Sequence, residues 1–295
     1  MKKYFILAAA ALTLAACSND ESNTANDNVI RLSSSVGVVT RAASDIYPSG
    51  GHFENGTAVK VQLTADDGSV TYSAIDYTDD GSGTLTGEST QYYPANGTAV
   101  SGYAYYPSDA STASNGFVLG NQDDDTDYKK YDLMHATLTS ITQNSNAAAR
   151  TLTFNHLLSK ITVTLVKGTA ETSELDAATV TLKDVIVKGT FNPALASGTF
   201  TAAADEDANK GDIVIATNAG TTAHSAIVIP QTMTGKKLEV KIGTATKEYT
   251  FPTSSFATGT NNTYTITVDK TGIVVTSTIG DWGPGNTVSD ESLTF

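Results

Sequence analysis

Apolar and polar residues alternate along most of the chain, which is the pattern of β-strands that bury one face. The first alternating run covers 29–39, where one mostly apolar face consists of Ile30, Leu32, Ser34, Val36 and Val38. Further strand-like runs follow at 59–63, 102–107, 160–165, 184–191, 212–217, 225–230, 262–269 and 271–279. The segment 236–251 alternates in two halves and predicts a β-hairpin.

Helical periodicity is nearly absent, since no apolar period of 3.6 residues continues beyond residue 17 and the best helical candidate, 168–180, is short. The sequence therefore predicts an all-β protein. So many short strands rarely share one core. We expect two tandem β-sandwich domains of transthyretin-like, Greek-key topology, an N-terminal one over 42–165 and a C-terminal one over 166–295.

The first 17 residues have the pattern of a signal peptide, because Lys2 and Lys3 precede a short apolar run that ends in small residues. Residues 14–17 (LAAC) resemble the bacterial lipobox, in which the cysteine becomes the first mature residue and carries lipid. We therefore expect 1–17 to be a lipoprotein signal, with Cys17 as the lipid attachment site. No later segment is apolar enough to cross a membrane, so this lipid would be the only anchor.

Charge and cysteine content narrow the function classes. The chain carries 31 acidic and 18 basic residues, a formal net charge of −13. No basic cluster is present to neutralise phosphates, so we expect no nucleic-acid partner. Cys17 is the only cysteine, which rules out an internal disulfide.

Residues that could support catalysis or metal binding are scattered. Asp123, Asp125 and Asp127 have the opening spacing of a calcium loop. Tyr128 stands where that loop requires glycine, however, and Met134 where it requires a bidentate glutamate. The sequence has no G-x-S-x-G motif and no phosphate-binding glycine loop. The histidines also lack metal-ligand spacing: His52, His135, His156 and His224. We expect no enzymatic activity, no metal and no cofactor.

Several polar or aromatic groups have a structural interpretation. The pairs Asp66–Asp67 and Asp79–Asp80 flank glycine turns and are typical of solvated turns. His156 is interpreted as a packed or hydrogen-bonded residue rather than a catalytic one. Five tyrosines lie close together, and their alternation favours core packing over a platform for sugars or proteins: Tyr92, Tyr93, Tyr103, Tyr105 and Tyr106.

The order of motifs along the chain resembles the fimbrillin-like lipoproteins of Bacteroidota, which include the Mfa-like proteins and type V pilins. The lipobox is followed by VVTRA, GYAYYP, YDLMHA, LTFNHLLSKITVTL, IVIPQT and STIGDWGPG, which begin at residues 38, 102, 131, 152, 227 and 277. Each motif is weak alone, but their order and spacing are specific, and the resemblance extends over nearly the whole chain.

The resemblance implies a function for the N-terminal segment. Pilins of this type are exported as outer-membrane lipoproteins and cut by an arginine-specific surface protease, and the matching bond here is Arg41–Ala42. This cut would make 18–41 a propeptide and would remove Cys17 with its lipid, together with the strand that contains Ile30, Leu32, Val36 and Val38. The groove left behind would accept a strand from another fimbrial subunit, identical or different.

The family takes the donor strand from the C-terminal region, and this chain has two candidates. In 271–279, Ile273, Val275, Ser277 and Ile279 alternate much as the first strand does, with the serine at the same place. The tail 287–295 alternates poorly, although the family places its donor at the very end. The first candidate could equally be a fixed strand of its own domain.

The sequence thus predicts a stalk or tip subunit of extracellular fimbriae. The alternative is a surface lipoprotein that keeps its anchor at Cys17 and binds glycan or a host protein. The motifs do not separate stalk, tip and anchor subunits, nor do they identify an adhesive ligand.

Overall fold

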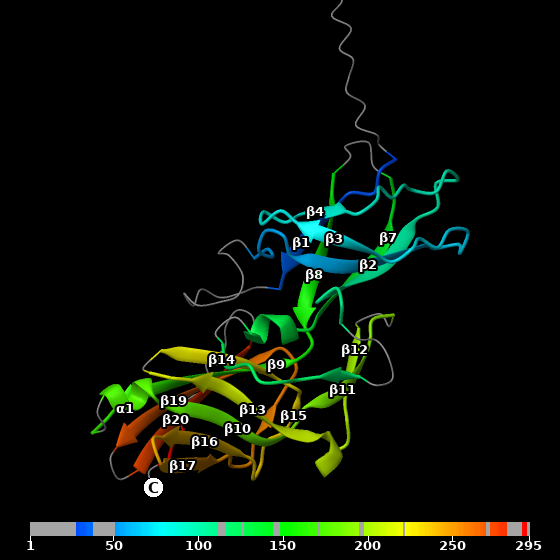
Figure 1. Cartoon of the computed structure of the whole chain (residues 1–295). Coiled ribbons are helices and arrows are strands. Elements are labelled where there is room, and N and C mark those ends of the chain that lie inside the picture. Colours follow the sequence, from blue (N-terminus) through cyan, green and yellow to red (C-terminus); the bar gives the residue numbers. More distant parts are fainter. Residues whose placement is uncertain are drawn as a thin grey trace, which may run out of the picture.

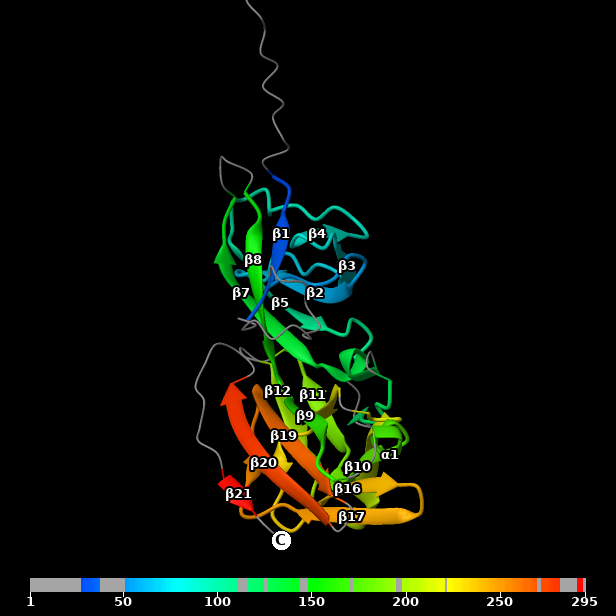
Figure 2. The ribbon, with the colours of Figure 1, turned by 90° about the vertical axis from the view of Figure 1, so that its left-hand side faces the viewer.

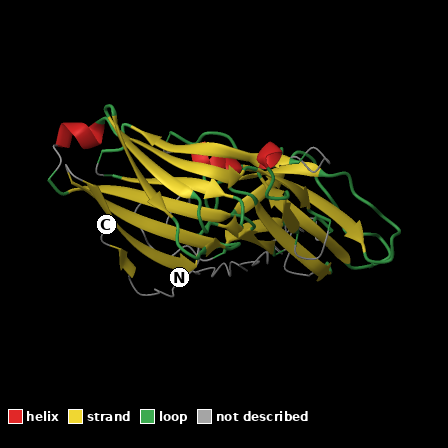
Figure 3. Cartoon of the chain, turned by 90° about the horizontal axis from the view of Figure 1, so that it is seen from below, coloured by secondary structure: helices red, strands yellow, loops and turns green. Residues whose placement is uncertain are grey.

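The computed structural model describes residues 28–37, 51–110, 116–124, 127–143, 148–169, 172–194, 198–220, 222–269, 272–281 and 291–293. Strands dominate this part of the chain (Figure 3). Its helices are short: η1 (Asp127–Tyr131), α1 (Thr172–Asp176) and η2 (Asp207–Asn209). The expected all-β class is confirmed, and among the described residues of the helical candidate at 168–180 the five residues of α1 are helical.

The N-terminal strands form a closed barrel in the upper part of the molecule (Figure 1). Its members are β1 (Leu32–Val36), β2 (Ala58–Ala65), β3 (Ile75–Asp79), β4 (Thr84–Gly87), β5 (Val100–Tyr106), β7 (Met134–Ile141) and β8 (Arg150–His156). Their order is β1-β4-β3-β2-β5-β7-β8, and β8 pairs back to β1. This differs from the predicted sandwich, because β1 is paired on both sides and joins two strands that would otherwise be edges.

The remaining strands form four sheets, and most of them lie in the lower part of the molecule (Figure 1). The largest sheet has five strands in the order β14 (Ala223–Val228), β9 (Ser159–Lys167), β19 (Thr260–Asp269), β20 (Gly272–Asp281) and β21 (Glu291–Leu293). A four-stranded sheet runs β13 (Lys210–Thr217), β10 (Thr179–Ile186), β16 (Lys237–Ile242), β17 (Ala245–Thr250). One small sheet has the order β12 (Thr199–Ala202), β11 (Lys188–Asn192) and β6 (Phe117–Val118). The other consists of β15 (Gln231–Thr232) and β18 (Ser255–Phe256). The predicted hairpin at 236–251 is confirmed as β16 and β17.

The change from barrel to lower sheets comes earlier than the boundary expected at 165/166. Strand β9 begins at Ser159 and pairs with β14 and β19, so hydrogen bonding assigns it to the C-terminal part. Strand β8 ends at His156 in the barrel, which places the change between these two residues. In addition, β6 pairs with β11, so one short strand of the N-terminal half belongs to a C-terminal sheet.

The buried side chains of both parts belong to one continuous hydrophobic cluster. Alternation explains this burial. In β2, for example, Val59, Val61 and Leu63 are fully buried while the residues between them are partly exposed. Among the residues that the structure describes, no helix has the length and apolar character needed to cross a membrane.

Candidate functional site

Strand β1 presents one buried face and one partly exposed face, as its alternation predicts. Ile30, Leu32, Ser34 and Val36 are each at most 3% exposed. The residues between them, Arg31, Ser33 and Ser35, are half-buried on the outer side of the barrel. Three apolar side chains and one hydroxyl of this segment therefore reach into the core.

Backbone hydrogen bonds hold this segment along both of its edges. On one side β1 runs parallel to β8, with Leu32 opposite Arg150 and Val36 opposite Phe154. On the other side it is antiparallel to β4, where Leu32 lies opposite Leu85. Figure 2 shows β1 between these two strands.

The second edge continues beyond β4 at both ends of the segment. The Ile30 amide donates to the Gln91 carbonyl at 2.9 Å, and the Val36 amide donates to the Gly51 carbonyl at 2.7 Å. Removing 28–37 would therefore leave a row of unpaired donors and acceptors on two sides of a slot.

The floor of this slot is apolar and aromatic. Leu152 and Phe154 of β8 are fully buried, and Leu85 of β4 is 6% exposed. The Phe154 ring meets the Phe53 ring edge to face, with centroids 4.9 Å apart. These side chains belong to the same buried cluster as Ile30, Leu32 and Val36, so an apolar strand in the place of β1 can cover them.

A buried carboxylate lies under the centre of β1. Asp79, the last residue of β3, is 0% exposed, and the Ser34 hydroxyl donates a hydrogen bond to its Oδ2. The amides of Gly81 and Gly83 donate to its Oδ1 at 2.7 and 3.2 Å. The interpretation of Asp79 as a solvated turn residue is therefore wrong, whereas Asp80 is exposed as expected.

The backbone of the turn after β3 directs the amides of Gly81 and Gly83 toward Asp79. Gly81 and Gly83 have φ angles of +83° and +93°, which favour glycine. A Cβ on Gly83 would lie 2.4 Å from Nδ1 of His52. That same Nδ1–H donates to the Ser34 carbonyl at 3.0 Å, so His52 and Asp79 hold Ser34 by its backbone and its side chain.

The alternation of β3 gives a signal for Asp79 that the sequence interpretation missed. Tyr77 is 3% exposed and lies two residues before it, on the same face of the strand. Burial raises the pKa of Tyr77 to about 12, and its hydroxyl donates to Gln91 Oε1 at 3.1 Å. The inner wall of the barrel next to β1 therefore carries polar groups that need specific partners.

The C-terminal donor candidate is a strand of its own sheet. Strand β20 pairs with β19 from Gly272 to Asp281, and Ile273 and Val275 are 6% and 2% exposed. On its other side, within the described residues, β20 pairs with the three residues of β21. Ile279 belongs to β20, but its side chain lies outside the described part. For β20 to act as a donor, it would have to leave β19.

The described residues do not include four of the predicted site positions. Cys17, Val38, Arg41 and Ala42 all lie outside them, as does Asp125 of the calcium-like loop. Within the described ranges, the structure has no group of three or more His, Cys, Asp or Glu residues that could hold a metal ion. Asp127 instead forms an ion pair with Lys130 at 2.7 Å.

The histidines are distributed over different structural contacts. His156 is buried and its Nδ1 lies 2.8 Å from Asp132 Oδ1, so its interpretation as a packed, hydrogen-bonded residue is confirmed. His135 Nε2 donates to the Pro193 carbonyl at 2.9 Å, and burial lowers the pKa of His135. His224 Nε2 donates to the Ala219 carbonyl at 2.6 Å. Each ring therefore ties together segments of the fold.

The tyrosine cluster is mostly part of the packing. Tyr93 is 7% exposed, and Tyr103, Tyr105 and Tyr106 are half-buried, whereas Tyr92 is 46% exposed. The expectation that most of these rings pack against the core is confirmed.

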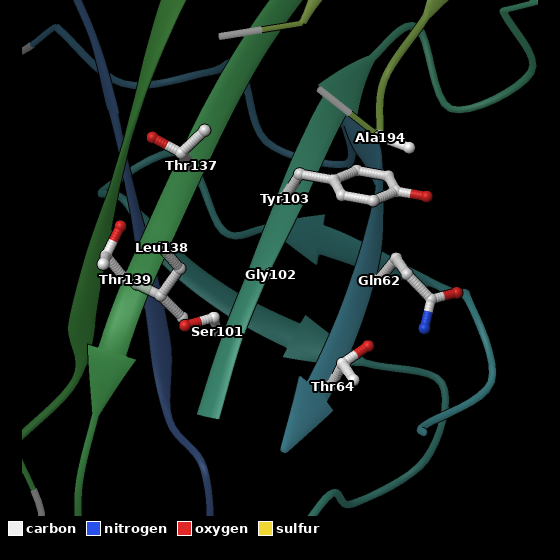
Figure 4. A pocket seen from close by; sticks show the side chains of 9 residues that line it. All are labelled: Gln62, Thr64, Ser101, Gly102, Tyr103, Thr137, Leu138, Thr139 and Ala194. Carbon is white, nitrogen blue, oxygen red and sulfur yellow. The ribbon is translucent and has the colours of Figure 1, made fainter. Parts of the chain in front are cut away.

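A shallow hollow of about 350 Å³ lies on the outer face of β2, β5 and β7 (Figure 4). Gln62, Tyr103 and Thr137 contribute side chains, and no charged residue lines it. The hollow brings together no acid, base or nucleophile pair, so it has the character of a neutral surface depression.

Comparison with solved structures defines the class of fold. Two crystal structures from Bacteroides, each described as a "putative cell adhesion protein", share it. The one from Bacteroides uniformis has a TM-score of 0.68 at 20% identity and covers 87% of this chain and 98% of that chain. The one from Bacteroides ovatus has a TM-score of 0.63 at 19% identity and covers 88% and 99%.

The sequence comparison identifies the family. The model of the family described as fimbrillin-like matches residues 40–282, so the chain belongs to the fimbrillin-like family. This confirms the resemblance found in the sequence motifs. A curated Bacteroides uniformis protein named "Putative fimbrium subunit Fim1C" is 25% identical over 305 aligned positions, which cover 97% of each chain.

Proposed function

We propose that this chain is a stalk or tip subunit of a cell-surface fimbria. It is delivered to the outer membrane as a lipoprotein through Cys17 and is cut after Arg41 by an arginine-specific surface protease. The mature subunit, which begins at Ala42, joins identical or different fimbrial subunits by donor-strand exchange. The relative named "Putative fimbrium subunit Fim1C" and the family membership support this assignment.

The observation that carries the proposal is the position of β1 in both sequence and space. It is the first strand of the described chain, it ends five residues before Arg41, and it closes the barrel between β4 and β8. A cut at Arg41 turns this strand into a separate peptide that is held only by noncovalent contacts. The family match begins at residue 40, so β1 lies outside the matched region.

The energetics favour replacement of β1 over an empty slot. Burial of Ile30, Leu32 and Val36 contributes about 1.5–3 kcal/mol for each side chain. Loss of the strand also removes the backbone hydrogen bonds that β1 makes to β4 and β8, each of which contributes about 0.5–1.5 kcal/mol net. A strand of similar pattern from another subunit would restore both contributions, as in β-augmentation.

The arrangement of the chain favours assembly from one subunit to the next. Strand β1 lies in the barrel, whereas β21 lies at the opposite end of the molecule (Figure 2). A C-terminal segment that fills the slot of a neighbouring copy makes a head-to-tail contact. Such contacts generate open fibres when the rotation between copies does not close a ring.

The other two arginines are poor competitors for the protease. The Arg150 amide donates to the Arg31 carbonyl at 2.8 Å, so the backbone of both residues is engaged in the sheet. Proteolysis is concentrated at segments whose backbone is free of such bonds. The backbone bonds at Arg31 and Arg150 should therefore slow proteolysis at these two residues.

The test is the intact mass of the protein recovered from the cell surface, together with its gel mobility, for the wild type, Arg41→Ala and Arg41→Lys. We expect the wild type to begin at Ala42 and to form ladders of multimers. Arg41→Ala should abolish both, and Arg41→Lys should also abolish both if the protease is specific for arginine. A lipidated species that begins at Cys17 in every strain, without ladders, would contradict the proposal and favour a permanently anchored binding protein.

A further inference from the structure

The Asp79 carboxylate depends on β1 for only one of its partners. Its Oδ1 accepts hydrogen bonds from the amides of Gly81 and Gly83, which belong to its own turn. Its Oδ2 accepts a hydrogen bond from the Ser34 hydroxyl, which belongs to the removable segment. Loss of β1 therefore leaves the turn contacts in place and takes away the partner of Oδ2.

We infer that Asp79 selects a donor strand with a hydroxyl group at the position of Ser34, and that Ser277 of a second copy supplies this hydroxyl. The inference rests on the donor-strand exchange proposed above and adds the residue that sets its register. An empty slot leaves Oδ2 open to water. A new strand covers Asp79 again, because Asp79 is 0% exposed under β1. A strand with an apolar side chain at this position would leave a buried charged oxygen without a donor.

Alternation alone cannot set the register of an incoming strand. A slip of one residue turns its apolar face outward and is strongly disfavoured. A slip of two residues keeps the same face inward, so it must be distinguished in another way. With Asp79 at one fixed point of the slot, a slip of two places an apolar side chain against the carboxylate. The hydroxyl–carboxylate pair therefore discriminates between registers that apolar packing tolerates.

The segment 273–279 matches this requirement position by position. Ile273, Val275, Ser277 and Ile279 correspond to Ile30, Leu32, Ser34 and Val36. Ile273 and Val275 point into their own core, and Ser277 is half-buried on the same face of β20. The face that β20 turns inward in its own sheet is thus the same apolar-apolar-hydroxyl face that β1 turns into the barrel.

The tail 287–295 meets the requirement less well. Ser289 is followed two residues later by Glu291, and Ser292 is preceded at the same spacing by Asp290. Either register would put an acidic side chain on the inward face, close to the buried Asp79 carboxylate. Among the described residues, β21 covers three positions along one edge of β20, whereas the other edge pairs with β19 from Gly272 to Asp281, so β20 has to leave β19 to act as a donor. We therefore assign the second copy's Ser277 as the partner.

The experiment uses the full chain, cut after Arg41 by an arginine-specific protease that is then inactivated. Labelled peptides of residues 28–39 are offered as replacements for the cut segment, and capture is measured by fluorescence anisotropy. The decisive pair is Ser34→Thr and Ser34→Val, because threonine and valine have similar shapes and differ by the hydroxyl. We expect capture of the valine peptide to be about 10- to 100-fold weaker.

The second set uses peptides of residues 271–281 with Ser277→Thr and Ser277→Val. We expect the same preference for the hydroxyl. In the cut Asp79→Val chain the preference should disappear or reverse, because the hydroxyl of the threonine peptide then has no carboxylate to accept its hydrogen bond, whereas the valine peptide meets an apolar side chain. The peptide series alone still tests the inference if the Asp79→Val chain does not fold.

The outcomes separate this inference from the function on which it rests. Equal capture of the threonine and valine peptides would overturn the role of Asp79 and leave strand exchange intact. Capture of 28–39 but not of 271–281 would overturn the assignment of Ser277. Failure of even the unaltered 28–39 peptide to enter the slot would overturn strand exchange itself, and the inference with it.

Discussion

The Ser34 hydroxyl donates a hydrogen bond to the Asp79 carboxylate, and both side chains are at most 1% exposed. The two residues are 45 positions apart in the chain and come from the first and third strands of the barrel. This bond places the only polar inward-facing side chain of β1 against the only buried acid of β3, within the described residues of those strands.

The uncut chain should lose stability when this bond is removed. We expect Ser34→Val to lower the free energy of unfolding by about 1–3 kcal/mol, because it buries a carboxylate oxygen without its donor. Ser34→Thr should retain most of the stability. Residue 35 faces outward, so Ser35→Val should change the free energy of unfolding by less than about 0.5 kcal/mol. Urea unfolding of the Arg41→Ala background measures all three, and equal losses at Ser34 and Ser35 would refute the role of the hydroxyl.

The turn that supplies the other donors to Asp79 should be intolerant of side chains. Gly83→Ala should be strongly destabilising, because its φ is +93° and a Cβ would lie 2.4 Å from His52 Nδ1. Gly97→Ala is the matched control, since its φ is +75° and no atom lies within 4 Å of its Cβ. The control should cost about 1–2 kcal/mol for backbone strain alone. Thermal unfolding should show a clearly lower midpoint for Gly83→Ala, and similar midpoints would argue against a tight contact with His52.

The sequence predicted the individual strands better than it predicted which strands pair with one another. Alternation from Ile30 to Val36 identified β1, and the pattern of 236–251 identified the β16–β17 hairpin. Alternation indicates which face of a strand is buried, but it does not indicate which other strand pairs with it. The closure of the barrel by β1 pairs it with β8, more than 100 residues later, and no local pattern contains this information.

The domain boundary expected from the sequence at 165/166 differs from the observed change between β8 and β9 for a related reason. Leu157 and Leu158 connect the two strands and are both apolar, whereas turns are usually marked by Gly, Pro, Asn, Asp or Ser. Asp79 was misread because its sequence, DDGSG, has the composition of a solvated turn. Only the fold shows that the first of these two aspartates completes the inward face of β3.

Stability should decrease in mild acid because of His135. Burial lowers the pKa of His135 below the ordinary histidine value of 6.5, while the hydrogen bond to the Pro193 carbonyl opposes the shift. The unfolded chain takes up this proton near pH 6.5, but the folded chain binds it only at lower pH, so stability falls as the pH drops below about 6.5. His135→Gln has no proton to bind there and should show a smaller loss between pH 7.5 and pH 5. Urea unfolding at several pH values measures this, and identical pH slopes for the two proteins would exclude His135 as a contributor.

Substitutions on the two sides of one strand pair should act at different stages of assembly. Leu32 of β1 lies opposite Leu85 of β4, and both are buried. Leu32→Ala and Leu85→Ala should each lower the stability of the uncut chain, by about 2–5 kcal/mol for a fully buried leucine.

After the cut, the two variants should differ. Residue 32 has left the subunit, so Leu32→Ala polymers should dissociate at the same temperature as wild-type polymers. Leu85 remains in the slot and contacts the incoming strand, so Leu85→Ala polymers should dissociate at a lower temperature. Gel mobility after stepwise heating of isolated fibres distinguishes the two. If Leu32→Ala weakened the fibres as much as Leu85→Ala does, β1 would still be present in them, and the exchange of this strand would be excluded.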